Sequence, residues 1–177
     1  MKSKRILLFF VFFILFLVPK AFSHIGFGVS PALVLADDFP VLFSATFRSD
    51  KNPWVFFLNL ENDFESSDKT DIKKISFFAD DWFISERISE HLDYFVLWGV
   101  SGGVLYDKND GGKNLYEVST GCRFGAGLDF LFFKRHFEIF TQAAWNPYFG
   151  VKIDDGDLSA FLRPACFPLT CGIRLLF

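Results

Sequence analysis

The longest alternating stretch of this chain, from Tyr116 to Phe132, is the feature that most constrains its fold. Apolar side chains such as Phe124 and Leu128 recur at every second position, and glycine or charged residues such as Arg123 and Asp129 lie between them. A side-chain period of two belongs to a β-strand, because successive strand residues point to opposite faces. The stretch therefore predicts a strand with one apolar face and one face of small and charged residues.

The same division recurs along the chain beyond its N-terminal segment and predicts eight strands. The contrast is weakest in the fourth strand, where Phe78 and Trp82 interrupt the alternation. The expected strands are Ile25–Leu35, Val41–Phe47, Trp54–Leu60, Ile75–Phe83, Leu92–Tyr106, Tyr116–Phe132, Phe137–Ile153 and Phe161–Phe177.

The two faces can be assigned because the interior of an eight-stranded barrel is only wide enough to be filled by side chains. The phenylalanine-rich faces are too bulky to fit there together, whereas the glycine-rich faces fit well. We expect the apolar faces to contact lipid, since so large an apolar surface in water would drive aggregation. The predicted fold class is all-β, an eight-stranded antiparallel up-and-down transmembrane β-barrel.

Residues 1–23 have the three parts of a signal peptide: a basic start, an apolar run at Ile6–Val18 and a small-residue cleavage site at Ala21–Ser23. The apolar run is shorter than the roughly 20 residues of a spanning helix, so we expect cleavage. The predicted domains are a cleaved signal peptide (1–23) and a barrel (24–177). The signal segment carries basic but no acidic residues, so the remainder is more negative than the whole chain's −3, which argues against a nucleic-acid partner.

The connections between the predicted strands differ at the two ends of the barrel. The odd-numbered gaps are acidic and include the longer ones; they are Ala36–Asp38, Glu61–Asp71, Asp107–Lys113 and Asp154–Leu158. Long connections are typical of outer loops, so the opposite end is expected to face the periplasm. We expect Trp54, Trp82 and Tyr94 in an aromatic girdle near the periplasmic end. Arg163, which shares the lipid-facing parity of the last strand, is expected in the headgroup zone.

Charged residues on the inward faces form the candidate site. They are Arg48, Glu61, Glu117, Arg123, Asp129, Glu138, Lys152 and Arg174. A functional interpretation is the polar lining of a pore. We favour a structural salt-bridge network that fills the lumen, because eight strands leave no open channel.

No catalytic residue, metal site or cofactor is expected. The histidines His24, His91 and His136 fall at the N-terminus or at periplasmic turns, and no set of nucleophile, base and orienting group can be assembled. The cysteines Cys122, Cys166 and Cys171 are odd in number and contain no C-x-x-C pair. They indicate neither a disulfide framework nor a structural zinc site.

These features resemble the small eight-stranded outer-membrane barrels typified by the OmpA membrane domain, OmpX and OmpW. The resemblance rests on the signal peptide, the strand number, the loop asymmetry and the terminal Phe177 with Ile173 and Leu175 before it. Gly121–Phe130, followed by Phe137–Phe140 and Trp145, is also similar to small barrels of uncharacterised function predicted in spirochaetes. The resemblance implies that a barrel-assembly machinery recognises Ile173, Leu175 and Phe177 as a C-terminal assembly signal.

The predicted function is that of an integral protein in the outer membrane of a diderm bacterium, with membrane lipid as a partner. It has a filled polar interior and a structural or surface-interaction role without catalysis. The sequence names no external partner. Two alternatives stay open: a narrow OmpW-like channel for small ions or hydrophobic solutes, and a soluble periplasmic ligand-binding barrel resembling lipocalins.

Overall fold

The computed structural model describes residues 25–35, 40–49, 52–62, 72–108, 114–154 and 156–177 and is built of antiparallel strands. The strands are β1 (Ile25–Leu35), β2 (Val41–Ser49), β3 (Asn52–Asn62), β4 (Ile72–Ser89), β5 (Leu92–Lys108), β6 (Asn114–Phe132), β7 (Phe137–Trp145), β8 (Tyr148–Asp154), β9 (Asp157–Arg163) and β10 (Phe167–Leu176). Among these residues, no helix has the length and apolar character needed to cross a membrane.

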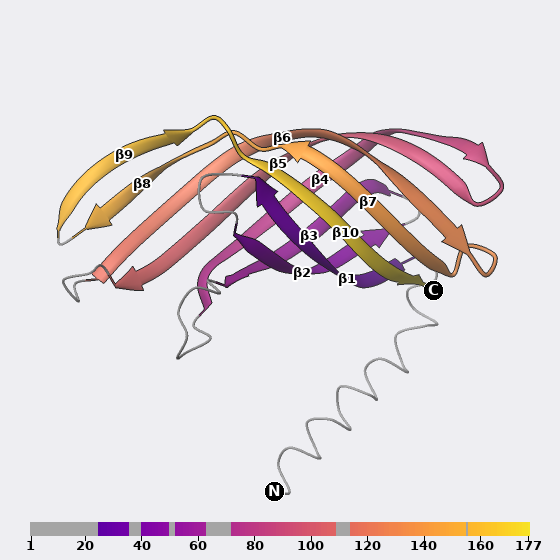
Figure 1. Cartoon of the computed structure of the whole chain (residues 1–177), viewed down its shortest axis with the longest axis horizontal. Coiled ribbons are helices and arrows are strands. Elements are labelled where there is room, and N and C mark those ends of the chain that lie inside the picture. The colour runs from indigo at the N-terminus through magenta and orange to yellow at the C-terminus, as the bar shows by residue number, and fades with distance from the viewer. Residues whose placement is uncertain (1–24, 36–39, 50–51, 63–71, 109–113, 155) are drawn as a thin grey trace, which may run out of the picture.

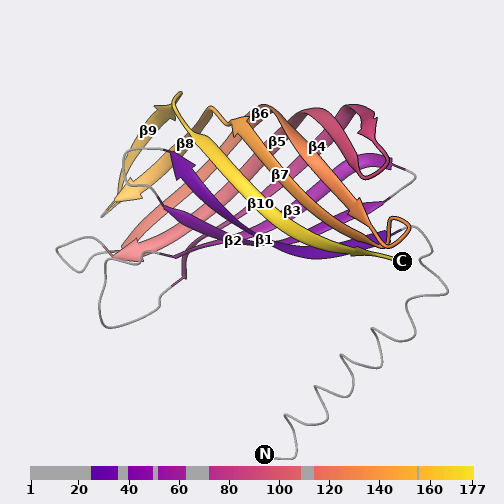
Figure 2. The ribbon, with the colours of Figure 1, turned by 45° about the vertical axis from the view of Figure 1, so that its right-hand side comes forward.

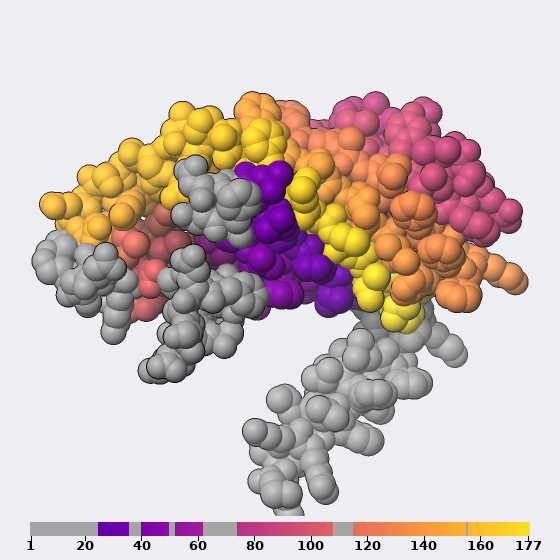
Figure 3. Space-filling view, in the orientation of Figure 1, coloured from indigo at the N-terminus to yellow at the C-terminus, as the bar shows by residue number. Residues whose placement is uncertain are grey.

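The strands form one closed barrel (Figures 1 and 2). The ladder runs β5–β4–β3–β2–β1–β10–β7–β6, and β6 pairs with β5, so the ring closes with eight strands. The first and last strands are neighbours on the surface (Figure 3), with Gly26 opposite Leu176. The amide of Phe177 donates to the carbonyl oxygen of Ile25 at 3.0 Å. The predicted all-β, eight-stranded antiparallel barrel is confirmed.

Ten segments form eight strands because two strands are interrupted at prolines. β7 and β8 both pair with β6 in one register, on either side of Asn146 and Pro147. Proline has no amide hydrogen to donate to a ladder, so the pairing stops there and resumes. β9 and β10 are separated by Pro164–Cys166 in the same way. The seventh predicted strand is therefore β7 with β8, and the eighth is β9 with β10.

A β-bulge between β9 and β10 exchanges the faces of the last strand. The amide of Asn146 donates to the carbonyl oxygen of Cys166 at 2.8 Å, and Tyr148 lies opposite Arg163. The β9–β10 side thus has one residue more than its partner between these two points, and one extra residue reverses the side-chain parity. The expected lipid-facing parity of Arg163 is wrong: it shares the face of Tyr148, whose ring packs against the barrel interior.

The predicted apolar and small-residue faces lie on the outside and inside of the barrel. On β6, Phe124 is exposed whereas Arg123 and Asp129 are buried. On β10 every second residue is exposed, including Ile173 and Leu175. Each of the eight strands carries exposed large apolar side chains on its outer face. Such a surface requires an apolar surrounding.

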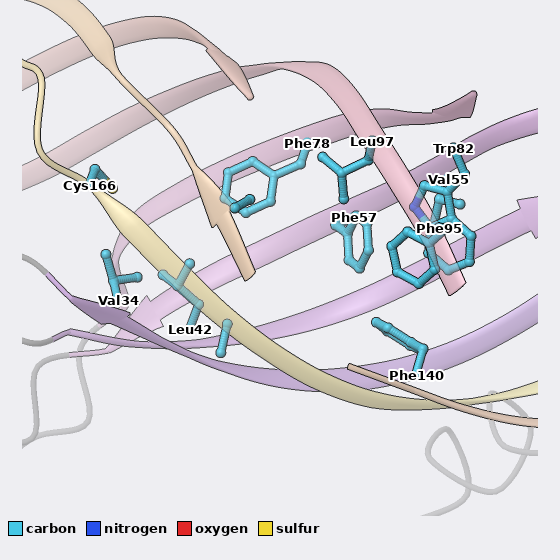
Figure 4. Close-up of a cluster of buried hydrophobic side chains, with 12 residues drawn as sticks. Val34, Leu42, Val55, Phe57, Phe78, Trp82, Phe95, Leu97, Phe140 and Cys166 are labelled. Carbon is cyan, nitrogen blue, oxygen red and sulfur yellow. The ribbon is translucent and has the colours of Figure 1, made fainter. Parts of the chain in front are cut away.

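The interior contains an aromatic cluster that the sequence did not indicate (Figure 4). Phe57, Phe78, Phe95 and Phe140 are all buried in it. Trp82 is also inside, 3% exposed, and stacks on Phe95 with the ring centroids 3.5 Å apart. The expected place of Trp82 in an outer aromatic girdle is therefore wrong.

Glycines provide the room for these rings. Phe95 lies opposite Gly127 on β6, and a Cβ atom on Gly127 would overlap the Phe95 ring. A side chain at Gly127 would therefore force the ring out of its position. The inner glycines and the inner rings are thus two parts of one packing arrangement.

Replacing Phe124 with lysine should destabilise the barrel by about 2–4 kcal/mol, because its exposed ring lies near the middle of β6 on the lipid-facing side. The measurement is the free energy of unfolding by urea in lipid vesicles. The matched control is Phe133→Lys, since Phe133 is 78% exposed in the β6–β7 turn, outside the strands. Equal losses in both variants would contradict the assignment of the outer face.

Candidate functional site

A buried ion pair between β4 and β6 forms the first part of the charged interior. Arg123 donates from Nε to Oδ1 of Asp80 at 2.7 Å and from Nη2 to Oδ2 at 3.2 Å. Gln142 Nε2 also donates to Oδ2, at 3.4 Å. The Arg123 guanidinium lies 3.8 Å from the centroid of the Phe78 ring. Bidentate geometry and a stacked ring hold the guanidinium in a single orientation.

Gly99 makes this pair possible. It lies on β5 between the two partners, opposite Asp80 on one side and Arg123 on the other. A Cβ atom on Gly99 would come within 2.5 Å of Oδ1 of Asp80. Only a residue without a side chain lets Arg123 reach across the intervening strand.

A second group of charges joins β10, β7, β2 and β6. Arg174 and Glu138 lie opposite each other and form a fully buried ion pair between Nη1 and Oε1. Arg48 Nη1 donates to the same Glu138 oxygen at 3.2 Å and to Oδ2 of Asp129 at 2.9 Å. Two cations and two anions compensate one another, as buried charges require.

Gly28 has the same function in this group as Gly99 has in the first. Arg174 donates from Nε to Oγ1 of Thr46 at 2.9 Å, across strand β1. Gly28 lies opposite both of them, and a Cβ atom there would come within 2.5 Å of Cγ of Arg174. Both groups therefore depend on a glycine in the strand between hydrogen-bond partners.

Aromatic rings cover the charges of the second group. The Arg174 guanidinium lies 3.9 Å from the centroid of the Phe140 ring, and that of Arg48 lies 4.6 Å from the Trp82 ring. These contacts place the cations on ring faces, where the quadrupole attracts them. The aromatic cluster and the ion pairs are thus interleaved layers of one packed interior.

The remaining predicted residues lie nearer the loop end of the barrel. Glu117 is 3.7 Å from Lys74, and Lys152 is 3.5 Å from Asp154. Glu61 is partly buried and follows the inner parity of Asn59. The structure therefore brings Arg48, Asp129, Glu138 and Arg174 together. It places Arg123, Glu117 and Lys152 in separate ion pairs.

The sequence analysis missed Asp80 and Lys74, the partners of Arg123 and Glu117. Both belong to β4, where Phe78 and Trp82 point inward and blur the alternation. The register of β4 against β5 could have indicated Asp80. Gly99 belongs to the inward-facing residues of the fifth strand, and Asp80 lies opposite it on β4. Pairing strands by their inner glycines would have located this carboxylate.

The two histidines among the described residues, His91 and His136, make polar contacts with the ends of neighbouring strands. Nδ1 of His91 lies 3.1 Å from the carbonyl oxygen of Leu131, and Nδ1 of His136 lies 3.1 Å from that of Leu176. The carbonyl oxygens of the same histidines accept the amides of these leucines at 2.9 Å. Each histidine thus fixes the end of an adjacent strand. His24 lies outside the described residues.

Within the described part of the chain, no three histidine, cysteine or acidic side chains are grouped to hold a metal ion. The cysteines Cys122, Cys166 and Cys171 are free thiols. Cys122 and Cys171 are exposed on the outer face, and Cys166 is buried.

Replacing Asp80 with asparagine should destabilise the barrel by about 3–5 kcal/mol, since it leaves the buried Arg123 without a counter-charge. The double variant Asp80→Leu with Arg123→Met should recover most of this loss, because no buried charge remains. Urea unfolding in lipid vesicles measures both. A double variant less stable than the single one would show that the pair contributes more than mutual neutralisation.

Comparisons with known proteins agree with this architecture. The crystal structure of the N-terminal β-barrel domain of Pseudomonas aeruginosa OprF superposes with a TM-score of 0.54 and 13% identity, covering 88% of this chain and 98% of that domain. Neisserial surface protein A gives a TM-score of 0.50 and 11% identity, covering 87% of this chain and 96% of its own. No family model and no curated protein matches the sequence. The chain has the fold of the small eight-stranded outer-membrane β-barrels.

Proposed function

We propose that this chain is an integral outer-membrane protein of a diderm bacterium with a structural or surface-interaction role, and that it catalyses no reaction. The observation that carries the proposal is the combination of an apolar outer face with a lumen filled by paired charges and rings. The outer face favours insertion in lipid over the alternative of a soluble periplasmic ligand binder. The filled lumen favours a closed barrel over a channel.

The charge balance of the interior supports a closed barrel. Arg123 is compensated by Asp80, and Arg48 and Arg174 are compensated by Asp129 and Glu138. A conducting pore would instead need hydrated side chains along a continuous path. The interior charges are instead paired with one another and covered by aromatic rings, as expected for a packed lumen.

The β8–β9 hairpin supports a surface-interaction role. It continues past the end of β1 at the loop end (Figure 1), and Leu158 and Leu162 are exposed on it. Among the described residues β9 pairs only with β8. An unpaired strand edge can accept an extended segment of another chain.

The closed-barrel proposal predicts that the reconstituted protein shows no steady single-channel conductance in planar bilayers. A porin in the same bilayers serves as the positive control. Steady conductance whose ion selectivity reverses in Arg123→Glu would instead support the narrow OmpW-like channel.

We further propose that residues 1–23 are removed on export, that residues 24–177 form the barrel, and that the end with the short turns faces the periplasm. Ile173, Leu175 and Phe177 are exposed along one side of β10, the strand that closes the ring against β1. An apolar row on the closing strand is accessible to a barrel-assembly machinery before closure. These three residues are the proposed assembly signal.

Phe177→Asp should lower the amount of folded barrel in the outer membrane several-fold, because it places a charge in this apolar row. Heat-modifiable gel migration of isolated membranes measures the folded fraction. Phe133→Asp is the matched control, an exposed phenylalanine at the same end of the barrel but in a turn. Normal levels of the Phe177 variant would contradict the assignment of the signal.

A further inference from the structure

A carboxylate lies on the apolar outer face of the barrel. Asp81 on β4 is opposite Trp54 on β3 and Trp98 on β5, so the three side chains share one row on the outside. Trp98 is 41% exposed there, and Trp54 stacks on Phe56, which is exposed on the same face. The preceding residue, Asp80, points inward to Arg123, so the two adjacent carboxylates have opposite surroundings.

Among the described residues, Asp81 meets one hydrogen-bond donor and no compensating cation. The indole Nε1 of Trp98 donates to Oδ2 at 3.1 Å, whereas Oδ1 is buried and has no hydrogen-bond partner among the described residues. No cation pairs with Asp81 among the described residues, and its neighbours along the outer face of β4 are Ala79 and Phe83. A carboxylate on the lipid-facing side is unfavourable unless a cation or donor from the surroundings meets it.

The two indoles define the chemistry of this position, and Trp54 defines its depth. Trp54 and Trp98 meet edge to face with their ring centroids 5.7 Å apart, beside the carboxylate. Trp54 lies near the start of β3, close to the turn end of the barrel. Tryptophans of membrane proteins concentrate at the headgroup level. A carboxylate with a tryptophan opposite it on each neighbouring strand is suited to an ammonium ion, which can form an ion pair with the carboxylate and a cation–π contact with an indole ring.

We propose that Asp81, Trp54 and Trp98 bind the ammonium group of a phospholipid headgroup of the phosphatidylethanolamine type. This inference rests on the proposed membrane location. A primary ammonium supplies both a positive charge and hydrogen-bond donors for the carboxylate. The hydroxyl-bearing headgroup of phosphatidylglycerol supplies no cation and brings a net negative charge toward Asp81, so it is disfavoured. The trimethylammonium of phosphatidylcholine retains the charge but has no hydrogen to donate.

The experiment is native mass spectrometry of the folded full-length barrel, released from nanodiscs that contain equal parts of phosphatidylethanolamine, phosphatidylcholine and phosphatidylglycerol. We expect phosphatidylethanolamine to be retained over each of the other two by about three- to five-fold, the size of one partly exposed ion-pair and cation–π contact. Asp81→Asn should abolish the preference, since it keeps an acceptor for Trp98 and removes only the charge.

The matched control is Glu86→Gln. Glu86 is an exposed carboxylate on the same strand and accepts a hydrogen bond from the Tyr94 hydroxyl at 2.9 Å, without an indole pair beside it. This variant should keep the preference. Loss of the preference in Glu86→Gln as well would overturn the proposal, because any surface carboxylate would then suffice.

Three other results would also overturn it. The first is equal retention of the three lipids by the unaltered protein, a result that does not depend on the folding of any variant. The second is an unchanged lipid preference in Asp81→Asn. The third is a dimer of the unaltered protein that disappears in Asp81→Asn, which would assign the site to a second copy of the chain. A chain that does not insert into the nanodiscs would contradict the proposed membrane location instead. The two proposals therefore fail in distinguishable ways.

Discussion

The narrow interior of an eight-stranded barrel is the constraint on which the rest of this structure depends. Side chains must fill that space, and they must leave no charge uncompensated in it. The chain meets both requirements with layers in which arginines lie on aromatic rings and bind carboxylates, as Arg123 does with Phe78 and Asp80. Large side chains fit inside because glycines stand opposite them, as Gly127 does beneath Phe95. The remaining large apolar side chains are left for the outer face, which determines the surroundings the protein needs.

Much of the fold could be predicted from the alternation of apolar and polar residues. Once one face of a strand is known to point outward, a period of two assigns every other residue of that strand to the outside or the inside. On β6 and β10 the contrast between phenylalanine or leucine and glycine or charge is strong, and the observed burial follows it residue by residue. The inner aromatic cluster could not be predicted in this way. Phe57 and Phe140 are as apolar as their outward neighbours, so composition alone does not distinguish a ring in lipid from a ring in the lumen.

The candidate site was predictable in its residue types and less so in its pairs. Parity alone places Arg48, Asp129, Glu138 and Arg174 on the inner face, but it does not say which strands lie across the lumen from one another. The side-chain contacts inside the barrel depend on the register of neighbouring strands. The register also shows where an inner glycine leaves room for side chains of the two flanking strands to meet. Gly99 connects Asp80 with Arg123, and Gly28 connects Thr46 with Arg174. An inner glycine flanked in the ladder by an arginine on one side and a hydrogen-bond acceptor on the other is therefore a sequence-level sign of a buried contact, provided that the register is known.

Two of the β-bulges, one within β4 and one between β9 and β10, reverse the alternation inside a strand. Upstream in β4 the odd-numbered residues face outward, and the bulge between Asp81 and Ile84 reverses this, so that Arg87 faces inward opposite Asp93. The bulge before β10 does the same for Arg163, which lies opposite Tyr148. Without these extra residues, both arginines would continue the lipid-facing rows of their strands. Each bulge thus turns an arginine away from lipid and leaves the apolar rows of the rest of its strand in place. Asp81 lies immediately before a bulge and keeps its outward position, which is why its charge depends on a partner from outside the chain.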